Sequence, residues 1–394
     1  MTVSYVPVAL SEDLRAVLDE VLRARGAPPL SDVGRLGPKV AEVSRLYNAG
    51  LAGSATRAPI EGRIAFSFAR DVPKGGGAVR ELAQAGLLAA AEARPLRVVD
   101  LGAGLGAMSW GIARAVAPRP VEALLVDDDG EALAVASTLA KTASRLGAGA
   151  CTLAVQTRKA TLEPGMKLPE ADVVVLGQVL SELDGAEPAD ARIAKHAALL
   201  EDLLDRVVAP DGALVVVEPA LRDRSRHLHA VRDVLAGKGR TIFAPCLHAR
   251  PCPMLADPTA WCHDDLPVDL PAWLVPLARA AGLRFQGLTF AHLVLRRDGH
   301  TLAAASASEH DAQGRLHLRV VSDLLESKGK TEVFGCTSEG ERVRLRRLDR
   351  DAPSRGELDP WTNLRRGDVV ALDPPDERGR IPRAAAVDVW RARR

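Results

Sequence analysis

The sequence predicts an α/β fold with a mostly parallel β-sheet, preceded by a helical region and followed by a small β domain. Short apolar runs at 97–101, 122–126, 172–176 and 213–217 are each followed by a stretch with helical periodicity. Runs that are apolar throughout, rather than alternating, are typical of strands buried on both faces. A glycine-rich turn directly after the first run indicates a nucleotide-type cofactor site.

The composition limits the classes of protein to consider. The 394 residues are 47% hydrophobic and 26% charged, which is an ordinary balance for a globular chain. Because the net charge is only +1, a surface that binds RNA must be a local basic patch. No apolar stretch approaches the ~20 residues that span a bilayer, and the first residues lack the features of a secretory signal. We therefore expect a cytoplasmic monomer with no membrane partner.

The periodicity of the chain predicts four parts. Residues 1–75 form a helical N-terminal region, and residues 76–298 form the α/β domain with a cysteine-rich metal-binding insert at 241–266. A polar linker is expected at 299–314, followed by a small β domain of short strands at 315–394.

Two local expectations follow from the same reading. The stretch RDVPKGGGAVREL is interpreted as a glycine-rich turn before a helix, and not as a phosphate loop, since no strand precedes Lys74. The strings LRFQGL (283–288) and AHLVLRR (291–297) are expected to form an antiparallel hairpin that closes the sheet.

The string VVDLGAGLGAMSW predicts the cofactor loop. It reads as a buried strand that ends at Asp100, a turn with Gly102, Gly104 and Gly106, and the start of a helix. Glycines allow a tight turn and a close approach of the backbone to a ligand. The D-x-G-x-G-x-G pattern is that of class I methyltransferases, so it predicts S-adenosylmethionine as the cofactor rather than a dinucleotide.

Further cofactor contacts are expected at the ends of the neighbouring strands. Asp127, with Asp128 as second choice, follows the second strand and is placed to accept hydrogen bonds from ribose hydroxyls. Gln178 follows the fourth strand, where the adenine or the methyl acceptor would lie, and Glu218 ends the fifth. The N/D-P-P-Y motif of many amino methyltransferases is absent after the fourth strand. The sequence therefore assigns no catalytic residue.

Four of the five cysteines suggest one metal site. Three lie close together in the insert and the fourth belongs to the β domain: Cys246, Cys252, Cys262 and Cys336. Four thiolates suit either zinc or an iron–sulfur cluster, and their spacing alone favours neither. His248 and His263 are further candidate zinc ligands, whereas a proline after Cys252 is typical of iron–sulfur ligands. Cys151 is expected to be a core thiol.

Several strings resemble one family of proteins. IFAPCLHARPCPML, AWCHDD and GCTSEGE, with FSFARDVPKGGGAVREL and DLGAGLGAMSW, are similar to the methyltransferase-like assembly factors of the mitochondrial small ribosomal subunit and their bacterial relatives. The resemblance extends from about Phe66 to Asp368, and its most specific parts are the A-P-C-x-H-x-x-x-C-P and W-C-H strings.

This resemblance implies a [4Fe–4S] cluster on the four cysteines and a role with small-subunit ribosomal RNA. The first hypothesis is a methyltransferase-like protein that binds S-adenosylmethionine and acts on or binds this RNA during ribosome assembly. The second is a catalytically inactive assembly factor that binds RNA or the ribosome. The third is a small-molecule methyltransferase with a structural zinc ion.

The β domain contains one candidate RNA-binding face. In ERVRLRRL, the side chains of Arg342, Arg344 and Arg346 share one face of an expected strand. Such a face can contact phosphates, but Glu339 and Glu341 nearby equally favour an ordinary solvated surface.

Overall fold

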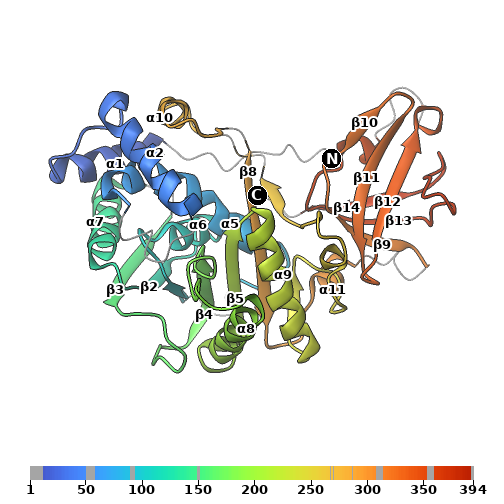
Figure 1. Cartoon of the computed structure of the whole chain (residues 1–394), viewed down its shortest axis with the longest axis horizontal. Helices are drawn as coiled ribbons and strands as arrows, with labels where there is room; N and C mark the ends of the chain where they lie inside the picture. The colour runs from blue at the N-terminus through green and yellow to red at the C-terminus, as the bar shows by residue number, and fades with distance from the viewer. Residues whose placement is uncertain are drawn as a thin grey trace.

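Two β-sheets organise the part of the chain that the computed structural model describes (Figure 1). The larger sheet is sandwiched between helices, and the smaller one stands beside it at the C-terminal end of the chain. The described residues are 12–49, 58–88, 94–148, 151–266, 268, 270–285, 287–307, 314–352 and 359–391.

The first sheet has eight strands in the order β3-β2-β1-β4-β5-β8-β6, and β7 also pairs with β8. Strands β1 to β5 run parallel, whereas β8 is antiparallel to β5, β6 and β7. The strands are β1 (Leu96–Leu101), β2 (Val121–Asp127), β3 (Leu153–Lys159), β4 (Ala171–Gly177), β5 (Val208–Pro219), β6 (Thr241–Ala244), β7 (Asp264–Leu266) and β8 (Leu288–Arg296).

The closing hairpin predicted from 283–288 and 291–297 is wrong. A single strand, β8, closes the sheet, and it begins at the last residue of the first string. One edge of β8 pairs with β5, and the other pairs with β6 and β7. The two short strands flank the cysteine-rich insert, so the insert supplies the partner that the hairpin was expected to supply.

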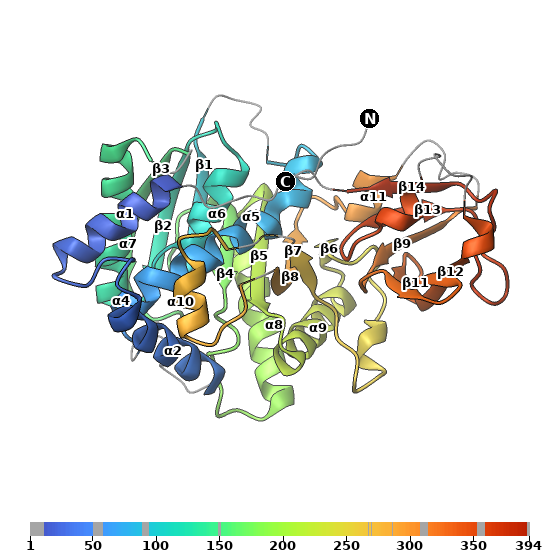
Figure 2. The same ribbon diagram turned by 90° about the horizontal axis from the view of Figure 1, so that it is seen from above.

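Helices cover both faces of the first sheet (Figure 2). Helix α1 packs on α7 and α10 packs on α2, at the end of the molecule far from the second sheet. The helical elements are α1 (Glu12–Ala24), α2 (Val33–Ala49), α4 (Ile60–Gly62), η1 (Arg63–Ser67), α5 (Phe68–Gln84), α6 (Ala107–Ala115), α7 (Gly130–Leu146), α8 (Ala189–Arg206), α9 (Arg222–Gly237), η2 (Pro253–Leu255), α10 (Val275–Ala280) and α11 (Leu302–Ser306). None of these helices is long and apolar enough to cross a membrane.

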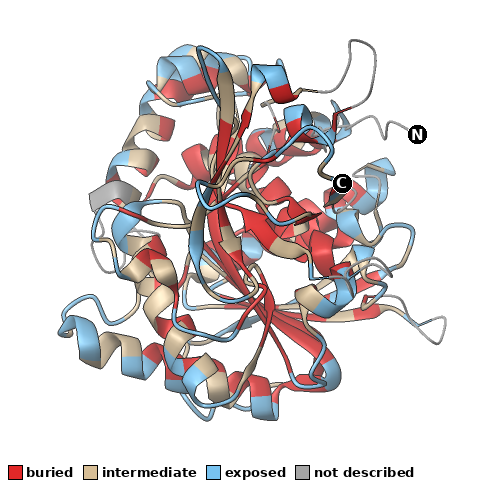
Figure 3. Cartoon of the chain, turned by 90° about the vertical axis from the view of Figure 1, so that its right-hand side faces the viewer, coloured by how far each residue is buried: buried red, intermediate tan, exposed pale blue. Residues whose placement is uncertain are grey.

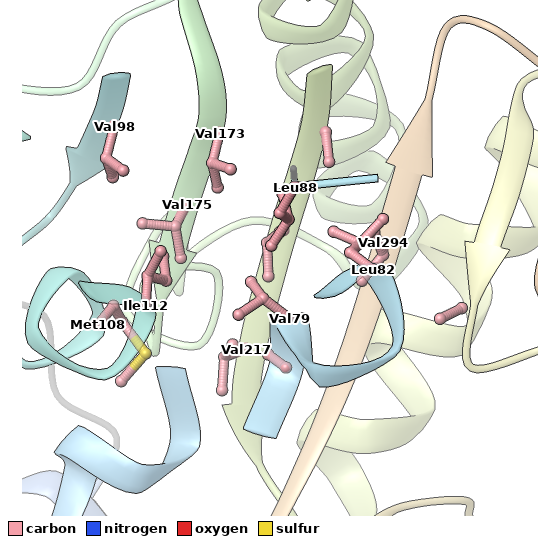
Figure 4. Packing of buried hydrophobic residues seen from close by; sticks show 14 of the residues in the cluster. Val79, Leu82, Leu88, Val98, Met108, Ile112, Val173, Val175, Val217 and Val294 are labelled. Atoms are coloured by element: carbon pink, nitrogen blue, oxygen red, sulfur yellow. The ribbon is translucent and has the colours of Figure 1, made fainter. Parts of the chain in front are cut away.

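Alternate residues of the strands face opposite helical layers. Val98, Val173 and Val215 pack against α5 and α6, as Figure 4 shows for the first two. Val99 and Val174 face α8 and α9 on the other side. Burial on both faces explains why these strands read as continuous apolar runs, and Figure 3 shows buried residues concentrated along the central strands.

The glycine triplet after Lys74 lies inside helix α5, so the predicted turn is wrong. A Cβ atom on Gly75 would lie 2.4 Å from the carbonyl oxygen of Met108 in α6. A Cβ atom on Gly111 would lie 2.1 Å from the carbonyl oxygen of Val72 in α5. The glycines therefore allow α5 and α6 to pack backbone against backbone, which holds both helices beside the cofactor loop.

The second sheet has six strands, in the order β10-β11-β9-β13-β14 with β12 on β11. Buried apolar side chains fill its interior, among them Trp361, which is fully buried. Part of the predicted linker forms the short helix α11, and 308–313 lie outside the described residues. The strands and short helices are β9 (Leu316–Val320), β10 (Leu325–Ser327), β11 (Lys330–Thr337), β12 (Arg342–Leu348), η4 (Asp349–Asp351), η5 (Pro360–Asn363), β13 (Val369–Leu372) and β14 (Val387–Trp390).

Buried ion pairs join the second sheet to the first. Arg319 of β9 donates to Glu81 of α5 at 2.7 Å and to Asp264 of β7 at 3.1 Å. Arg80 donates to the same carboxylate of Asp264 at 2.6 Å, and His292 of β8 lies 3.4 Å from it. All five side chains are at most 7% exposed, so removing one partner would leave a buried charge without compensation.

Candidate functional site

The turn after β1 has the conformation that its glycines predict. Gly102, Gly104 and Gly106 have φ angles of +64°, +51° and +80°, in the left-handed region that side chains disfavour. Gly106 is the residue before α6, and the free N–H groups at the start of that helix lie at the end of the turn. The glycines therefore allow the tight turn that joins β1 to α6.

This turn forms one wall of a pocket of about 310 Å³ at the carboxyl ends of β1, β2 and β4. The volume is at the lower end of the ~300–1,000 Å³ of small-molecule sites. Asp127 and Gln178 line the pocket together with Gly102 and Gly104, whereas Gly106 does not. Parallel strands end at the same edge of a sheet, which explains why residues predicted separately meet here.

Asp100 lies at the bottom of the pocket and fixes the turn to α6. Its Oδ2 accepts hydrogen bonds from the Ser109 hydroxyl at 2.7 Å and from the Ser109 N–H at 3.2 Å. Burial raises the pKa of Asp100 to about 7, although the bonds from Ser109 act in the opposite direction. The carboxyl group thus holds the loop in place and supports the pocket from below.

Asp127 joins the second strand to the glycine turn. Its Oδ2 accepts from the N–H of Gly104 at 2.7 Å, and its Oδ1 accepts from the N–H of Asp129 at 2.8 Å. Burial raises its pKa. Asp128, the second choice of the sequence, also lines the pocket. Both side chains therefore lie in the pocket beside the glycine turn.

Arg63 is a pocket residue that the sequence analysis missed. It comes from η1, is 5% exposed, and donates to Asp129 at 2.6 Å. A Cβ atom on Gly104 would lie 3.2 Å from its Nη2 atom, so the guanidinium lies against the turn. Its neighbour Tyr47, from α2, has its pKa raised to about 12 by burial. Only the packing of the N-terminal helices brings these residues here, and no motif marks them.

Gln178 occupies a strained position on the opposite side of the pocket. Its φ is +63°, and its side-chain amide donates to Asp71 of α5 at 2.9 Å. Asp71 also pairs with the buried Lys74 at 2.7 Å. Non-glycine residues with positive φ are uncommon and cluster at functional sites. The structure thus adds Asp71 to the pocket residues that the sequence predicted.

Glu218, at the end of β5, supports the turn that follows β4. Its Oε1 accepts from the N–H of Leu180 at 2.9 Å, and burial raises its pKa to about 7. Glu182, on the same turn, lines the cofactor pocket, and burial raises its pKa as well. Glu218 thus holds this turn from β5, whereas Glu182 on the turn lines the pocket.

The four predicted cysteine ligands line one cavity between the two sheets. Cys246 and Cys252 come from the insert, Cys262 lies just before β7, and Cys336 comes from β11. The fifth, Cys151, packs against the apolar clusters of the first sheet, away from this cavity. Residues far apart in the sequence are thus brought together at the contact between the domains.

Helix α9 holds the insert in position. Arg226 donates to the carbonyl oxygens of Met254, Asp257 and Ala260 at 2.8, 2.7 and 2.9 Å. His229, one turn further along, accepts from the N–H of Cys262 at 3.0 Å. These polar side chains satisfy the backbone of a segment that has little regular structure. The sequence does not predict that α9 holds the insert, because the helix has the pattern of an ordinary amphipathic helix.

The thiol groups lie in a cavity that two positively charged side chains also line. Burial, and then the neighbouring cysteines, raise the pKa values of Cys252 and Cys336 to about 12. Arg232 of α9 and Arg319 of β9 line the same cavity. Four thiols with cationic neighbours fit a thiolate-bound metal group, which carries net negative charge.

The histidines of the insert occupy different places. His248 lines the cavity, with its Nε2 atom 3.4 Å from Sγ of Cys336. His263 instead stacks on Trp261, with ring centroids 6.0 Å apart, and is not among the cavity residues. Among the described residues, no three His, Cys, Asp or Glu side chains are close enough together to hold a single metal ion.

The predicted RNA-binding arginines lie on β12 and differ in exposure. The side chains of Arg342 and Arg344 are 35% and 57% exposed, whereas Arg346 is half-buried. Arg342 pairs with Asp257 at 3.2 Å and Arg344 with Glu332 at 2.9 Å. The acids that contact the arginines are therefore not the Glu339 and Glu341 that the sequence suggested.

Strand order and pocket together define a class I methyltransferase-like α/β fold: five parallel strands, an antiparallel β8 inserted between β5 and β6, and a glycine turn after β1. This confirms the predicted fold of the main domain. The chain belongs to the family described as mitochondrial small ribosomal subunit Rsm22, which matches residues 69–341. The family suggested by the sequence strings is thereby confirmed. No curated protein matches the chain.

Solved methyltransferases are similar to the chain at low identity. A precorrin-6y C5,15-methyltransferase from Geobacter metallireducens is 13% identical, with a TM-score of 0.32 over 55% of this chain and 84% of that chain. A magnesium protoporphyrin IX methyltransferase from Synechocystis with bound S-adenosylmethionine is 16% identical, with a TM-score of 0.33 over 74% and 100%. A putative class I methyltransferase from Listeria monocytogenes is 14% identical, with a TM-score of 0.37 over 72% and 86%.

Proposed function

We propose that the protein is a methyltransferase-like assembly factor that binds S-adenosylmethionine, carries a [4Fe–4S] cluster, and acts on or binds the RNA of the small ribosomal subunit. The family match over residues 69–341 is the observation that supports this proposal most strongly. The matched range includes the complete glycine turn and all four clustered cysteines. The same family description supports the small subunit as the partner.

Each pocket residue has a role in the proposed binding of S-adenosylmethionine. Gly102 and Gly104 let the methionine part approach the backbone, and Asp127 accepts hydrogen bonds from the ribose hydroxyls. Asp100 and Gly106 hold the turn against α6, while Gln178 faces the adenine or the acceptor. When bound, the cofactor supplies an electrophilic methyl group.

Calorimetry with S-adenosylmethionine tests the pocket, and labelled methyl transfer to immature small subunits tests catalysis. We expect saturable binding at one site per chain. Transfer of label to the RNA would support an enzyme. Binding without transfer would support a factor that has kept the fold and lost turnover.

One observation favours this inactive alternative. The residues after β4 are Gly177-Gln178-Val179-Leu180, without the N/D-P-P-Y pattern of amino methyltransferases. The side chain of Gln178 is bonded to Asp71, and the backbone of Leu180 is bonded to Glu218. A turn held from both sides is suited to shaping the pocket, and it lacks the pattern that holds a target nitrogen.

The proposed cluster would be held by Cys246, Cys252, Cys262 and Cys336, which line one cavity. When bound there, it would supply binding free energy that holds the insert and the second sheet together. Iron and acid-labile sulfide should be found in about equal amounts in protein purified without oxygen, with a broad visible absorption. A colourless protein that contains zinc would support a structural zinc site instead, because Zn²⁺ has a filled d shell.

Three further expectations from the sequence stay predictions. These are the cytoplasmic location, the monomeric state and the domain limits at 75, 298 and 314. The family description names a mitochondrial protein, so location is best measured by imaging the tagged chain in its own cell.

A further inference from the structure

The second sheet has the connectivity of a small Greek-key barrel. β11 pairs with β9, β10 and β12, and β13 pairs with β9 and β14, all antiparallel. β9 and β10 follow one another along β11, as two halves of one bent strand. The N–H of Ile381 donates to the carbonyl of Arg346 at 2.8 Å, and the N–H of Arg346 donates to Gly379 at 2.9 Å. These bonds form an isolated parallel bridge between β12 and the segment that precedes β14.

This connectivity resembles that of the OB fold, a five-stranded, partly open Greek-key barrel that binds oligonucleotides on its second and third strands. Here the bent strand β9–β10 is the first, β11 the second, β12 the third, β13 the fourth and β14 the fifth. Trp361, on η5 between the third and fourth strands, fills the interior and donates to Thr331 at 2.7 Å. A fold alone does not establish a function, so binding of RNA has to be inferred from the side chains on the outer face of β11 and β12.

That outer face carries an aromatic ring between two exposed cations. Phe334 of β11 lies opposite Arg344 of β12 in the register. The guanidinium carbon of Arg342 is 4.9 Å from the centre of the Phe334 ring, and that of Arg344 is 5.8 Å away. Both guanidinium groups contact the ring while their side chains stay 35% and 57% exposed. Base stacking on aromatic rings and guanidinium planes is the usual way in which proteins hold unpaired nucleotides.

The same face continues into the cysteine cavity at its other end. Cys336 lies two residues after Phe334 on β11, so both side chains are on the same face of the strand, and Cys336 lines that cavity. Arg319 of the neighbouring strand β9 lies opposite Cys336. Asp257 of the insert accepts from Arg342 at 3.2 Å. One half of the outer face is thus used to contact the first domain. In the other half, Phe334 packs partly buried against apolar residues of the insert, and the side chains of Arg342 and Arg344 stay 35% and 57% exposed, so we call it the open half.

We propose that this open half binds a single-stranded segment of RNA, with one base stacked at Phe334 and Arg344 and adjoining phosphates paired to Arg342 and Arg344. The inference rests on the proposed function in taking RNA as the ligand. It goes further by placing the contact on the barrel and requiring the RNA to be unpaired there. Paired bases are stacked on each other, so a duplex would offer its phosphates but no free base.

The test uses the full chain loaded with its metal and a fluorescent oligouridylate of about 12 nucleotides, within the ~4–16 that OB domains cover. Anisotropy gives its Kd, and a duplex RNA of equal length is the comparison. Phe334→Leu keeps an apolar side chain against the insert but removes the ring. Arg344→Gln removes one exposed cation. Arg45→Gln is the matched control, because Arg45 is similarly exposed and also pairs with an acid, Glu42, far from the barrel.

We expect the single strand to bind more tightly than the duplex. Phe334→Leu should weaken binding of the single strand by ~5- to 100-fold, with little change in its salt dependence. Arg344→Gln should weaken it and lower the slope of log K against log salt by about 0.7. Arg45→Gln should change neither quantity. Thermal unfolding of each variant shows whether the fold is intact.

Two results would overturn the inference: equal binding of the single strand by the wild type and both variants, or equal affinity for single strand and duplex. Sedimentation with small-subunit particles, measured on the same preparations, separates this failure from that of the proposed function. If the variants lose no affinity while the protein still sediments with small subunits, only the placement on β11 and β12 is wrong. If the protein does not sediment with small subunits, the proposed function itself fails.

Discussion

The cofactor pocket and the cysteine cavity are built in opposite ways. The pocket is centred on one contiguous turn, Gly102–Gly106, at the edge of the sheet where its parallel strands end. The cavity takes residues from α9, the insert, β8, β9 and β11, and it exists only where two domains meet. The first site therefore depends on local backbone geometry, whereas the second depends on how distant parts of the chain dock.

The largest effect is expected from a substitution that tests whether the cysteine cavity depends on the contact between the two domains. Cys336→Ser removes the one proposed ligand from the second domain, so we expect loss of most of the iron and faster cleavage by protease between the two domains. Iron content and digestion pattern can be measured on one preparation. Cys151→Ser is the control and should change neither. A full iron load in Cys336→Ser would exclude it as a ligand, and His248 would be tested next.

Breaking the buried ion pairs beside the cavity should lower the free energy of unfolding by a large amount. Burial raises the pKa of Glu81, but Arg319 and Arg80 outweigh burial and lower it to about 2. Glu81→Gln leaves Arg319 with one carboxylate fewer, so we expect the free energy of unfolding to fall by about 3–5 kcal/mol. Glu42→Gln, at an exposed pair with Arg45, should have no measurable effect.

The same glutamate gives a pH dependence of known sign. Its pKa is lower in the folded chain than the ordinary value of 4.5, so its contribution is complete above pH 4.5 and is lost as the pH falls toward 2. The difference in unfolding free energy between wild type and Glu81→Gln should therefore shrink across that range. A constant difference would show that Glu81 acts through packing rather than charge.

A single substitution in the glycine turn should weaken the binding of S-adenosylmethionine. Gly104→Val puts a side chain at φ +51° and against Arg63, so we expect affinity for S-adenosylmethionine to fall by at least ~100-fold while iron content stays normal. Gly147→Val is the matched control, since its φ is +61° but nothing lies within 4 Å of the added Cβ. Unchanged affinity in calorimetry for Gly104→Val would remove this turn from the cofactor site.

A smaller effect is expected at the end of β2. Asp127→Asn keeps an oxygen that can accept from the N–H of Gly104 but removes the charge. We expect affinity for S-adenosylmethionine to fall by ~10-fold, the value of one charge-assisted hydrogen bond. An equal loss in Asp128→Asn alone, with none in Asp127→Asn, would move the ribose contact to the neighbouring residue.

Features formed by consecutive residues could be predicted from the sequence, whereas contacts formed when distant segments pack together could not. The glycine turn and Asp127 were found because a strand, a turn and a helix follow one another in the chain. Arg63 and Asp71 were missed, because they reach the pocket only through the packing of the N-terminal helices and α5. The hairpin was wrong for the same reason, since the partner strands of β8 come from the insert.

The cysteines are an instructive exception. They are far apart, yet residue type and family resemblance named the set that the structure gathers around one cavity. Thiols that share a metal site can be recognised by type, whereas arginines such as Arg226 and Arg232, which hold the insert, look like any helix surface in the sequence.

Sedimentation of the metal-loaded protein with ribosomal particles tests the proposed function most directly. We expect the wild type to travel with immature small subunits and not with large subunits, and to be released as salt concentration rises. Cys336→Ser, in which the contact between the two domains should be weakened, is expected to lose most of this association. Absence of the wild type from the small-subunit fraction, or equal amounts on both subunits, would contradict the assignment.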